Sequence, residues 1–179
     1  AYLGELIADF EKSAQNTTLK EEILNLYQES STRRTEPDTI KIYKTIGNIQ
    51  LEAHIFFPKE HSKNDKTPVY AFFHGGGWAV GIPEWGYKNC KRYQEKGMVA
   101  ISFEYRLIDI HGSNIIDCIK DVNSAILWIR QHANELGIDS NKVVAAGFSA
   151  GGHLATSTAV LDEFQLKDNS GFTSKPNAL

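Results

Sequence analysis

The sequence predicts an α/β fold in which a mostly parallel sheet is covered by helices on both faces. Apolar and polar residues alternate on both sides of Gly47-Asn48, which is typical of an antiparallel hairpin. A short, continuous apolar run over 69–73 is typical of a strand buried on both faces. Strands and helical patterns then alternate along the chain, and right-handed crossovers turn this order into a parallel sheet.

Residues 1–36 are expected to form a helical arm before the main domain, which is assigned to residues 37–179. Apolar residues recur at helical spacing over 3–14. Thr18 and Glu21 then form a capping-box pattern at the start of a second helix. We expect the arm to serve as a packing or linking segment without chemistry of its own.

The first half of the main domain is predicted to contain the hairpin, two strands and a helix. The hairpin covers 40–57, and a polar loop separates it from the strand at 69–73. A helix is predicted over 87–96, where it meets Gly97, a residue suited to the left-handed position after a helix end. The next strand is predicted over 98–105.

The second half of the domain is predicted to repeat the helix and strand order. Asn114 can cap a long helix whose apolar face runs to Ile129, and Gly137 can close that helix. A strand is predicted over 143–146, and a sharp turn at 147–151 leads into a further helix.

Composition and charge restrict the partners. A net charge of −3 over 179 residues leaves no broad basic surface, so neither nucleic acid nor an anionic membrane is expected as a partner. No apolar run approaches the roughly 18 residues of a membrane span, so we expect a soluble chain. The chain starts with Ala1, and it can be cytoplasmic or secreted with a leader removed. Cys90 and Cys118 lack metal-site spacing and are expected to be free buried thiols, with a disulfide between them as the alternative.

The turn at 147–151 has the sequence GFSAG, which fits the G-x-S-x-G nucleophile elbow. It lies between a predicted strand and a predicted helix, where that motif must lie. Small residues flank the serine because the turn is tight, and the strain lifts the hydroxyl clear of the sheet. The pattern and its context predict that Ser149 is a nucleophile.

A second motif, HGGGW at 74–78, directly follows the first predicted parallel strand. Ligands in open α/β sheets bind at that edge. Consecutive glycines allow backbone N–H groups to turn toward a substrate, and two such groups with the N–H of Ala150 can stabilise the oxyanion of a tetrahedral intermediate. The sequence therefore predicts an oxyanion hole here.

Together the two motifs resemble those of α/β-hydrolase esterases and lipases, in the branch with an H-G-G-G-W oxyanion motif. That branch includes hormone-sensitive-lipase-like esterases and acetyl-xylan or feruloyl esterases. The resemblance runs from about residue 40 to residue 179 and includes Tyr105-Arg106-Leu107 after the second parallel strand. It implies an α/β-hydrolase fold that is truncated before its C-terminal strands.

The resemblance assigns roles residue by residue. Ser149 is the implied nucleophile, and the backbone N–H groups of Gly76, Gly77 and Ala150 are the implied oxyanion donors. A shift of one residue in the loop would bring in the N–H of Trp78 instead. The ring of His74 is implied to hold the glycine loop in place. No metal and no organic cofactor is implied.

The family's triad order is serine, then an acid, then histidine, and too few residues follow Ser149 for either partner. His153 matches a family histidine that is not the general base. The resemblance makes Arg106 and Asp121 a structural ion pair. The last residues, 174–179, are expected to be a loop into a strand that is cut off as it begins.

Other titratable residues are not assigned to the site. Of the remaining histidines, only His111 lies in a loop that could approach Ser149. Asp162, Glu163 and Asp168 follow the serine, but the family's acid comes after one further strand. None of them is taken as a triad member.

The expected function is hydrolysis of small acyl or carbohydrate-linked esters through an acyl-enzyme on Ser149. Trp78, Trp85 and Tyr87 form a candidate aromatic wall for a sugar or a small acyl group. Without an acid and a base, the chain alone is expected to be inactive. The alternatives are a non-catalytic binding domain of the same fold, or an amidase or peptidase. We expect the open sheet edge to be covered by the C-terminal half or by another copy in a homo-oligomer.

Overall fold

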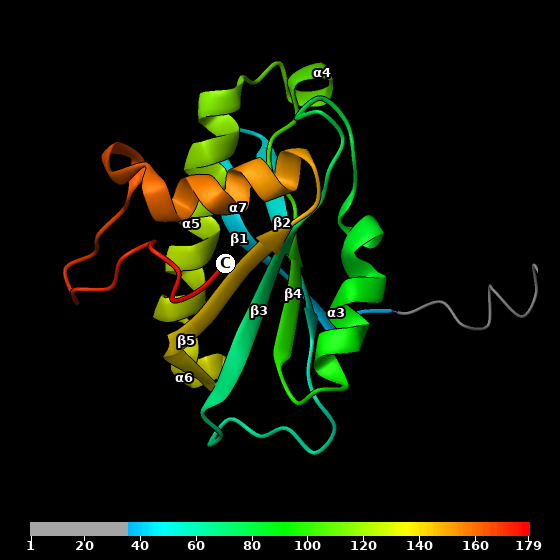
Figure 1. Ribbon diagram of the computed structural model, residues 1–179, viewed down its shortest axis with the longest axis vertical. Coiled ribbons are helices and arrows are strands. Elements are labelled where there is room, and N and C mark those ends of the chain that lie inside the picture. The colour runs from blue at the N-terminus through cyan, green and yellow to red at the C-terminus, as the bar shows by residue number, and fades with distance from the viewer. Residues whose placement is uncertain (1–35) are drawn as a thin grey trace, which may run out of the picture. The chain divides into compact units, whose positions relative to one another are not determined.

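The computed structural model describes residues 36–179, so the predicted helical arm, residues 1–36, lies outside the described residues except for Glu36. The described part contains a five-stranded sheet in the order β1-β2-β4-β3-β5 (Figure 1). The predicted α/β class, a hairpin followed by parallel strands, is confirmed. The strands are β1 (Thr39–Ile46), β2 (Ile49–Phe56), β3 (Thr67–Phe73), β4 (Val99–Phe103) and β5 (Ile138–Gly147).

The antiparallel half of the sheet contains the predicted hairpin. β1 pairs with β2, and β2 then pairs antiparallel with β4. Gly47 takes the left-handed conformation, with φ +56°, that the tight turn requires. The register shifts between Ile42 and Lys44, so Tyr43 lies at a bulge, where its ring packs edge-on against Phe103.

In the parallel half of the sheet, successive strands are added first on one side of β3 and then on the other. β3 lies between β4 and β5 and pairs parallel with both. The chain passes from β3 to β4 through α3 (Tyr87–Gln94) and then crosses back to β5 through α5 (Ile115–Gln131). Right-handed crossovers in opposite directions put these helices on opposite faces of the sheet (Figure 1). The carboxyl ends of β3 and β5 therefore border a topological switch point.

Each face of the sheet has its own apolar core, because alternate residues of β3 point to opposite sides. Tyr70 and Phe72 pack with Cys90 of α3. Ala71 and Phe73 pack on the other face, in the larger core that also contains the apolar face of α5. A continuous apolar strand is thus buried on both sides, as its sequence predicts.

Helix boundaries follow the predicted caps with one exception. The Asn114 side chain accepts a hydrogen bond from the Asp117 N–H at 3.1 Å, and the Asp117 carboxylate accepts one from the Asn114 N–H at 3.3 Å, which confirms the predicted cap of α5. The predicted close of this helix is wrong. α5 ends at Gln131 because His132 leaves helical geometry, with φ −100° and ψ 14°, and Gly137 closes a separate short helix instead.

The remaining helical elements lie between the strands or follow β5, the last strand. They are the 3₁₀ turn η1 (Pro83–Gly86), the one-turn helices α4 (Ile108–His111) and α6 (Ala133–Leu136), the helix α7 (Ala150–Val160) and the 3₁₀ turn η2 (Asp162–Phe164).

Two strands differ in length from the predicted ones. β4 is shorter than the predicted range 98–105: beyond its last residue the Glu104 N–H still donates to the Glu52 carbonyl of β2 at 2.9 Å, and the Arg106 N–H then donates to the Asp121 carboxylate. β5 starts before the predicted range 143–146, at Ile138, which pairs with the first residue of β3.

The final residues pair beside the outer edge of β5. Ala178 forms an isolated parallel bridge with Val144, and the Ala145 N–H donates to the Ala178 carbonyl at 3.0 Å. The predicted loop over 174–179 therefore ends where a further parallel strand begins to pair with β5.

The cysteines and the helix lengths can be compared with the predictions from the sequence. Cys90 and Cys118 are both buried and free, as predicted. Burial raises the pKa of the Cys118 thiol to about 11. Within residues 36–179, no helix is both long and apolar enough to cross a bilayer.

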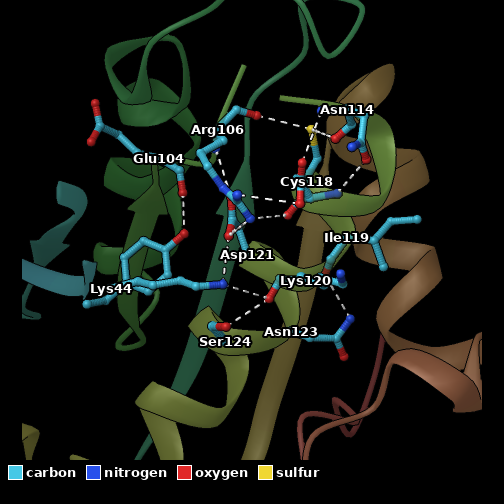
Figure 2. A network of polar contacts seen from close by, with 12 residues as sticks. Lys44, Glu104, Arg106, Asn114, Cys118, Ile119, Lys120, Asp121, Asn123 and Ser124 are labelled. Atoms are coloured by element: carbon cyan, nitrogen blue, oxygen red, sulfur yellow. Dashed lines mark hydrogen bonds and ion pairs between the residues drawn. The ribbon is translucent and has the colours of Figure 1, made fainter. Parts of the chain in front are cut away.

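A buried carboxylate, Asp121 of α5, fixes the turn that follows β4 (Figure 2). It accepts hydrogen bonds from Arg106 Nε at 2.8 Å, from Arg106 Nη2 at 2.9 Å and from Lys44 Nζ at 2.7 Å. The bond to Asp121 raises the pKa of the Arg106 guanidinium above its ordinary value. The ion pair that the resemblance implied is confirmed.

Close packing of α7 on β3 depends on one glycine. A Cβ atom at Gly151 would lie 2.0 Å from the Phe73 carbonyl oxygen and 2.4 Å from that of His74. At the next residue, Gly152, the nearest atom to such a Cβ is the Gly147 carbonyl oxygen at 3.4 Å. Only glycine fits at position 151, whereas position 152 has room for alanine.

This difference predicts opposite effects of two neighbouring substitutions. Gly151→Ala is expected to lower the free energy of unfolding by about 3 kcal/mol, because two backbones must separate. Gly152→Ala is expected to change it by no more than about 1 kcal/mol in the stabilising direction, through helix propensity. Urea denaturation of the two variants measures the difference, and equal losses would contradict the described packing.

The charge network predicts a second stability effect. Asp121→Asn keeps the shape of a side chain that is 0% exposed but leaves Arg106 and Lys44 without their carboxylate. The expected loss is about 3–5 kcal/mol of unfolding free energy. Glu135→Gln, which removes an exposed ion pair with Lys41, is the control and is expected to cost about 0–1 kcal/mol. A loss at Asp121 no larger than that of the control would refute a structural role for this network.

Candidate active site

Both sequence motifs begin at adjacent points of the sheet edge. Phe73, the last residue of β3, pairs in register with Gly147, the last residue of β5. The Phe148 N–H then donates to the Phe73 carbonyl at 3.3 Å, so the two loops separate only beyond this bond. The structure thus brings the HGGGW loop and the GFSAG turn together at the switch point.

The GFSAG turn has the strained geometry of a nucleophile elbow. Ser149 has φ +52° and ψ −118°, a conformation that non-glycine residues rarely adopt and that costs about 1–3 kcal/mol. A Cβ at Gly147 would lie 2.2 Å from the Gly151 carbonyl, so the turn requires glycine at position 147. Ser149 is solvent-exposed at its tip.

The glycine loop passes directly beside this serine. A Cβ at Gly75 would lie 3.4 Å from the Ser149 Cβ and 3.0 Å from the Phe148 carbonyl oxygen. Gly76 has φ +116°, and a Cβ there would lie 1.9 Å from the Val80 carbonyl oxygen. A side chain at Gly75 would crowd the serine turn, and one at Gly76 would clash with the loop's own backbone at Val80.

The predicted oxyanion donors carry free backbone N–H groups within the described part of the chain. Among residues 36–179, the N–H groups of Gly76, Gly77 and Ala150 donate to no backbone or side-chain acceptor. Ala150 is the first residue of α7, where the helix dipole favours negative charge. Their joint action on one oxyanion stays a prediction.

The His74 ring lies beneath the glycine loop and is 1% exposed. Its Nδ1–H donates to the Gly75 carbonyl at 2.7 Å, and its face stacks on the Tyr105 ring with centroids 4.4 Å apart. Burial lowers the pKa of the ring below the ordinary histidine value, which favours the neutral form. Gly81 leaves room for it, since a Cβ there would lie 2.3 Å from His74 Nδ1.

No histidine of the described range hydrogen-bonds to the Ser149 hydroxyl. The ring of His153 packs edge-on against Trp78, with centroids 5.4 Å apart, and the His153 backbone N–H donates to the Ser149 carbonyl at 3.1 Å. His111 uses Nδ1 to accept a hydrogen bond from the Leu107 N–H at 2.9 Å.

Two of the three acidic residues after the serine are engaged elsewhere. The Asp168 carboxylate accepts hydrogen bonds from the N–H groups of Ser170 and Phe172 in its own turn. Asp162 contacts Lys175 at 3.6 Å. Over residues 36–179, no group of three or more histidine, cysteine, aspartate or glutamate side chains could hold a metal ion.

The predicted aromatic wall is only partly formed. Trp85 is 56% exposed, and its ring lies 3.4 Å from the position that a Gly76 Cβ would take. The Tyr87 hydroxyl instead contacts His54 Nδ1 at 2.5 Å. Trp78 packs against the core beside His153.

Phe148, which sequence reasoning did not select, is 72% exposed next to Ser149. Its ring contacts the glycine loop, 3.1 Å from the position of a Gly75 Cβ. The sequence does contain a signal for it: the second residue of the elbow cannot turn its side chain into so tight a bend. Trp85 and Phe148 are thus two exposed aromatic side chains that lie next to the glycine loop.

Comparison with known proteins agrees with this geometry. A family model described as BD-FAE matches residues 53–178. A propionate-bound structure of the esterase Est2 from Thermogutta terrifontis is 36% identical, with a TM-score of 0.76, and the match covers 83% of this chain and 55% of that chain. The same esterase phosphorylated by paraoxon is 38% identical, with a TM-score of 0.74, over 78% of this chain and 55% of that chain.

An arylesterase from Saccharolobus solfataricus is 28% identical over 163 residues, which cover 89% of this chain and 51% of the relative. The chain therefore spans about half the length of these two esterases. The resemblance to α/β-hydrolase esterases is confirmed, and the chain belongs to the BD-FAE family of α/β-hydrolases.

Proposed function

We propose that the protein carrying this chain is a serine carboxylic-ester hydrolase with Ser149 as its nucleophile. The observation that carries the proposal is the exposed Ser149, on a strained turn beside the glycine loop. The names of the relatives support it, since both proteins compared are esterases by name and one of them has been phosphorylated by paraoxon. Organophosphates of that kind react with activated hydroxyl groups.

The proposed reaction has two acyl-transfer steps. Ser149 Oγ attacks the ester carbonyl carbon and gives its proton to a base, and the resulting oxyanion accepts hydrogen bonds from Gly76, Gly77 and Ala150. Collapse of this intermediate releases the alcohol, which takes the proton from the base. Water then attacks the acyl-enzyme, which releases the carboxylic acid and restores Ser149. The base and its acid partner are proposed to come from outside residues 36–179.

Small acyl groups and carbohydrate-linked esters are the proposed substrates. Trp85 and Phe148 present exposed aromatic surface on either flank of the glycine loop, which suits stacking with a sugar or contact with a short acyl chain. The propionate in a relative's structure supports the small acyl group.

The first test is substitution of the nucleophile in the full-length protein. Ser149→Ala is expected to lower kcat for a p-nitrophenyl ester by at least about 10⁴-fold, because no other group can form the acyl-enzyme. Ser157→Ala is the control: it removes a hydroxyl of the same helix that donates to the Leu154 carbonyl, and activity should be retained. Comparable kcat values for Ser149→Ala and wild type would rule out the proposed nucleophile.

The second test compares the 179-residue chain with the full-length protein. A fluorophosphonate is expected to label Ser149 of the full-length protein, as measured by intact mass, and to label the chain at least about 10³-fold more slowly for lack of a base. Equal labelling rates would show that the chain contains its own base. No labelling of the full-length protein would favour the non-catalytic binding domain.

A further inference from the structure

We propose that Tyr105 is a positioning residue of the oxyanion loop, a role that rests on the ester-hydrolase function proposed above. Three glycines in succession leave this loop with little conformational preference of its own. Oxyanion stabilisation requires donors that are already in place before charge develops. The loop must therefore be fixed by contacts from outside it.

Tyr105 makes such contacts at the start of the loop. It is 1% exposed, and its hydroxyl donates to the His74 carbonyl at 2.8 Å and lies 3.5 Å from the Gly75 carbonyl. Its ring stacks on the His74 ring at an interplanar angle of 19°. Burial raises the pKa of the phenol, so the hydroxyl stays a donor throughout the working range of pH.

The residues after Tyr105 hold the other end of the loop. The Ile108 N–H donates to the Trp78 carbonyl at 2.9 Å, and the Asp109 N–H donates to the Ala79 carbonyl at 3.3 Å. The two proposed glycine donors lie between these anchor points. Segment 105–109 thus braces the loop at both ends.

Segment 105–109 is itself fixed to α5. Arg106, the residue after Tyr105, is bound by the buried Asp121, and its carbonyl accepts a hydrogen bond from Cys118 Sγ at 3.1 Å (Figure 2). The Tyr105 hydroxyl is therefore presented from a rigid segment. Its loss should loosen the glycine loop rather than the sheet.

The experiment compares two phenylalanine variants of the full-length protein. Tyr105→Phe keeps the ring stacked on His74 but removes the hydroxyl. Tyr43→Phe is the matched control, because the Tyr43 hydroxyl also donates to a backbone carbonyl, that of Glu104 at 2.7 Å, without contact to the loop. Both changes remove one buried hydroxyl bond and are expected to lower Tm by similar amounts.

Only Tyr105→Phe is expected to lower kcat, by about tenfold with KM unchanged, because a loosened donor stabilises the transition state less but leaves ground-state binding alone. That loss is smaller than the ~10²–10³-fold loss from removing a donor outright. As a second measurement, a trifluoromethyl ketone, whose adduct with Ser149 carries an oxyanion, should bind Tyr105→Phe about tenfold more weakly and Tyr43→Phe as tightly as wild type.

The outcomes separate the two proposals. Equal kcat and inhibitor affinity for both variants, or a rise in KM alone for Tyr105→Phe, would overturn the positioning role while an active wild type left the esterase function intact. A wild-type protein that neither hydrolyses esters nor binds the ketone would remove the proposed function and this inference with it.

Discussion

The close approach of two backbones at the carboxyl ends of β3 and β5 is the constraint on which the site depends. The α7 backbone at Gly151 passes so near the carbonyls of Phe73 and His74 that a Cβ has no room. That approach brings the serine turn beside the glycine loop and forces Ser149 to a positive φ. Packing of the scaffold, rather than the site itself, thus offsets the strain at Ser149.

Buried charge supplies the second constraint. Asp121 binds Arg106 and Lys44, and these bonds join three elements: β1, α5 and the turn after β4. Burying these groups is tolerable because each finds a partner at hydrogen-bond distance. From this unit the segment that starts at Tyr105 reaches the glycine loop. Stability and site geometry are therefore coupled through a single turn.

The features of the fold and the site that depend on local sterics could be predicted from the sequence. Glycine patterns located the loop and the turn around Ser149, and the alternation around Gly47 located the hairpin. The end of α5 was misassigned because Gly137 follows a second helix that begins after a local distortion at His132. The contacts of Tyr105 could not be foreseen, since they join residues that are distant in the sequence.

A crystal structure of the full-length protein after reaction with a phosphonate ester tests the central claim most directly. The account predicts phosphorus bonded to Ser149 Oγ, with its anionic oxygen about 2.7–3.1 Å from the N–H groups of Ala150 and at least one of Gly76 and Gly77. An unmodified Ser149, or an adduct whose oxygen points away from these donors, would contradict it.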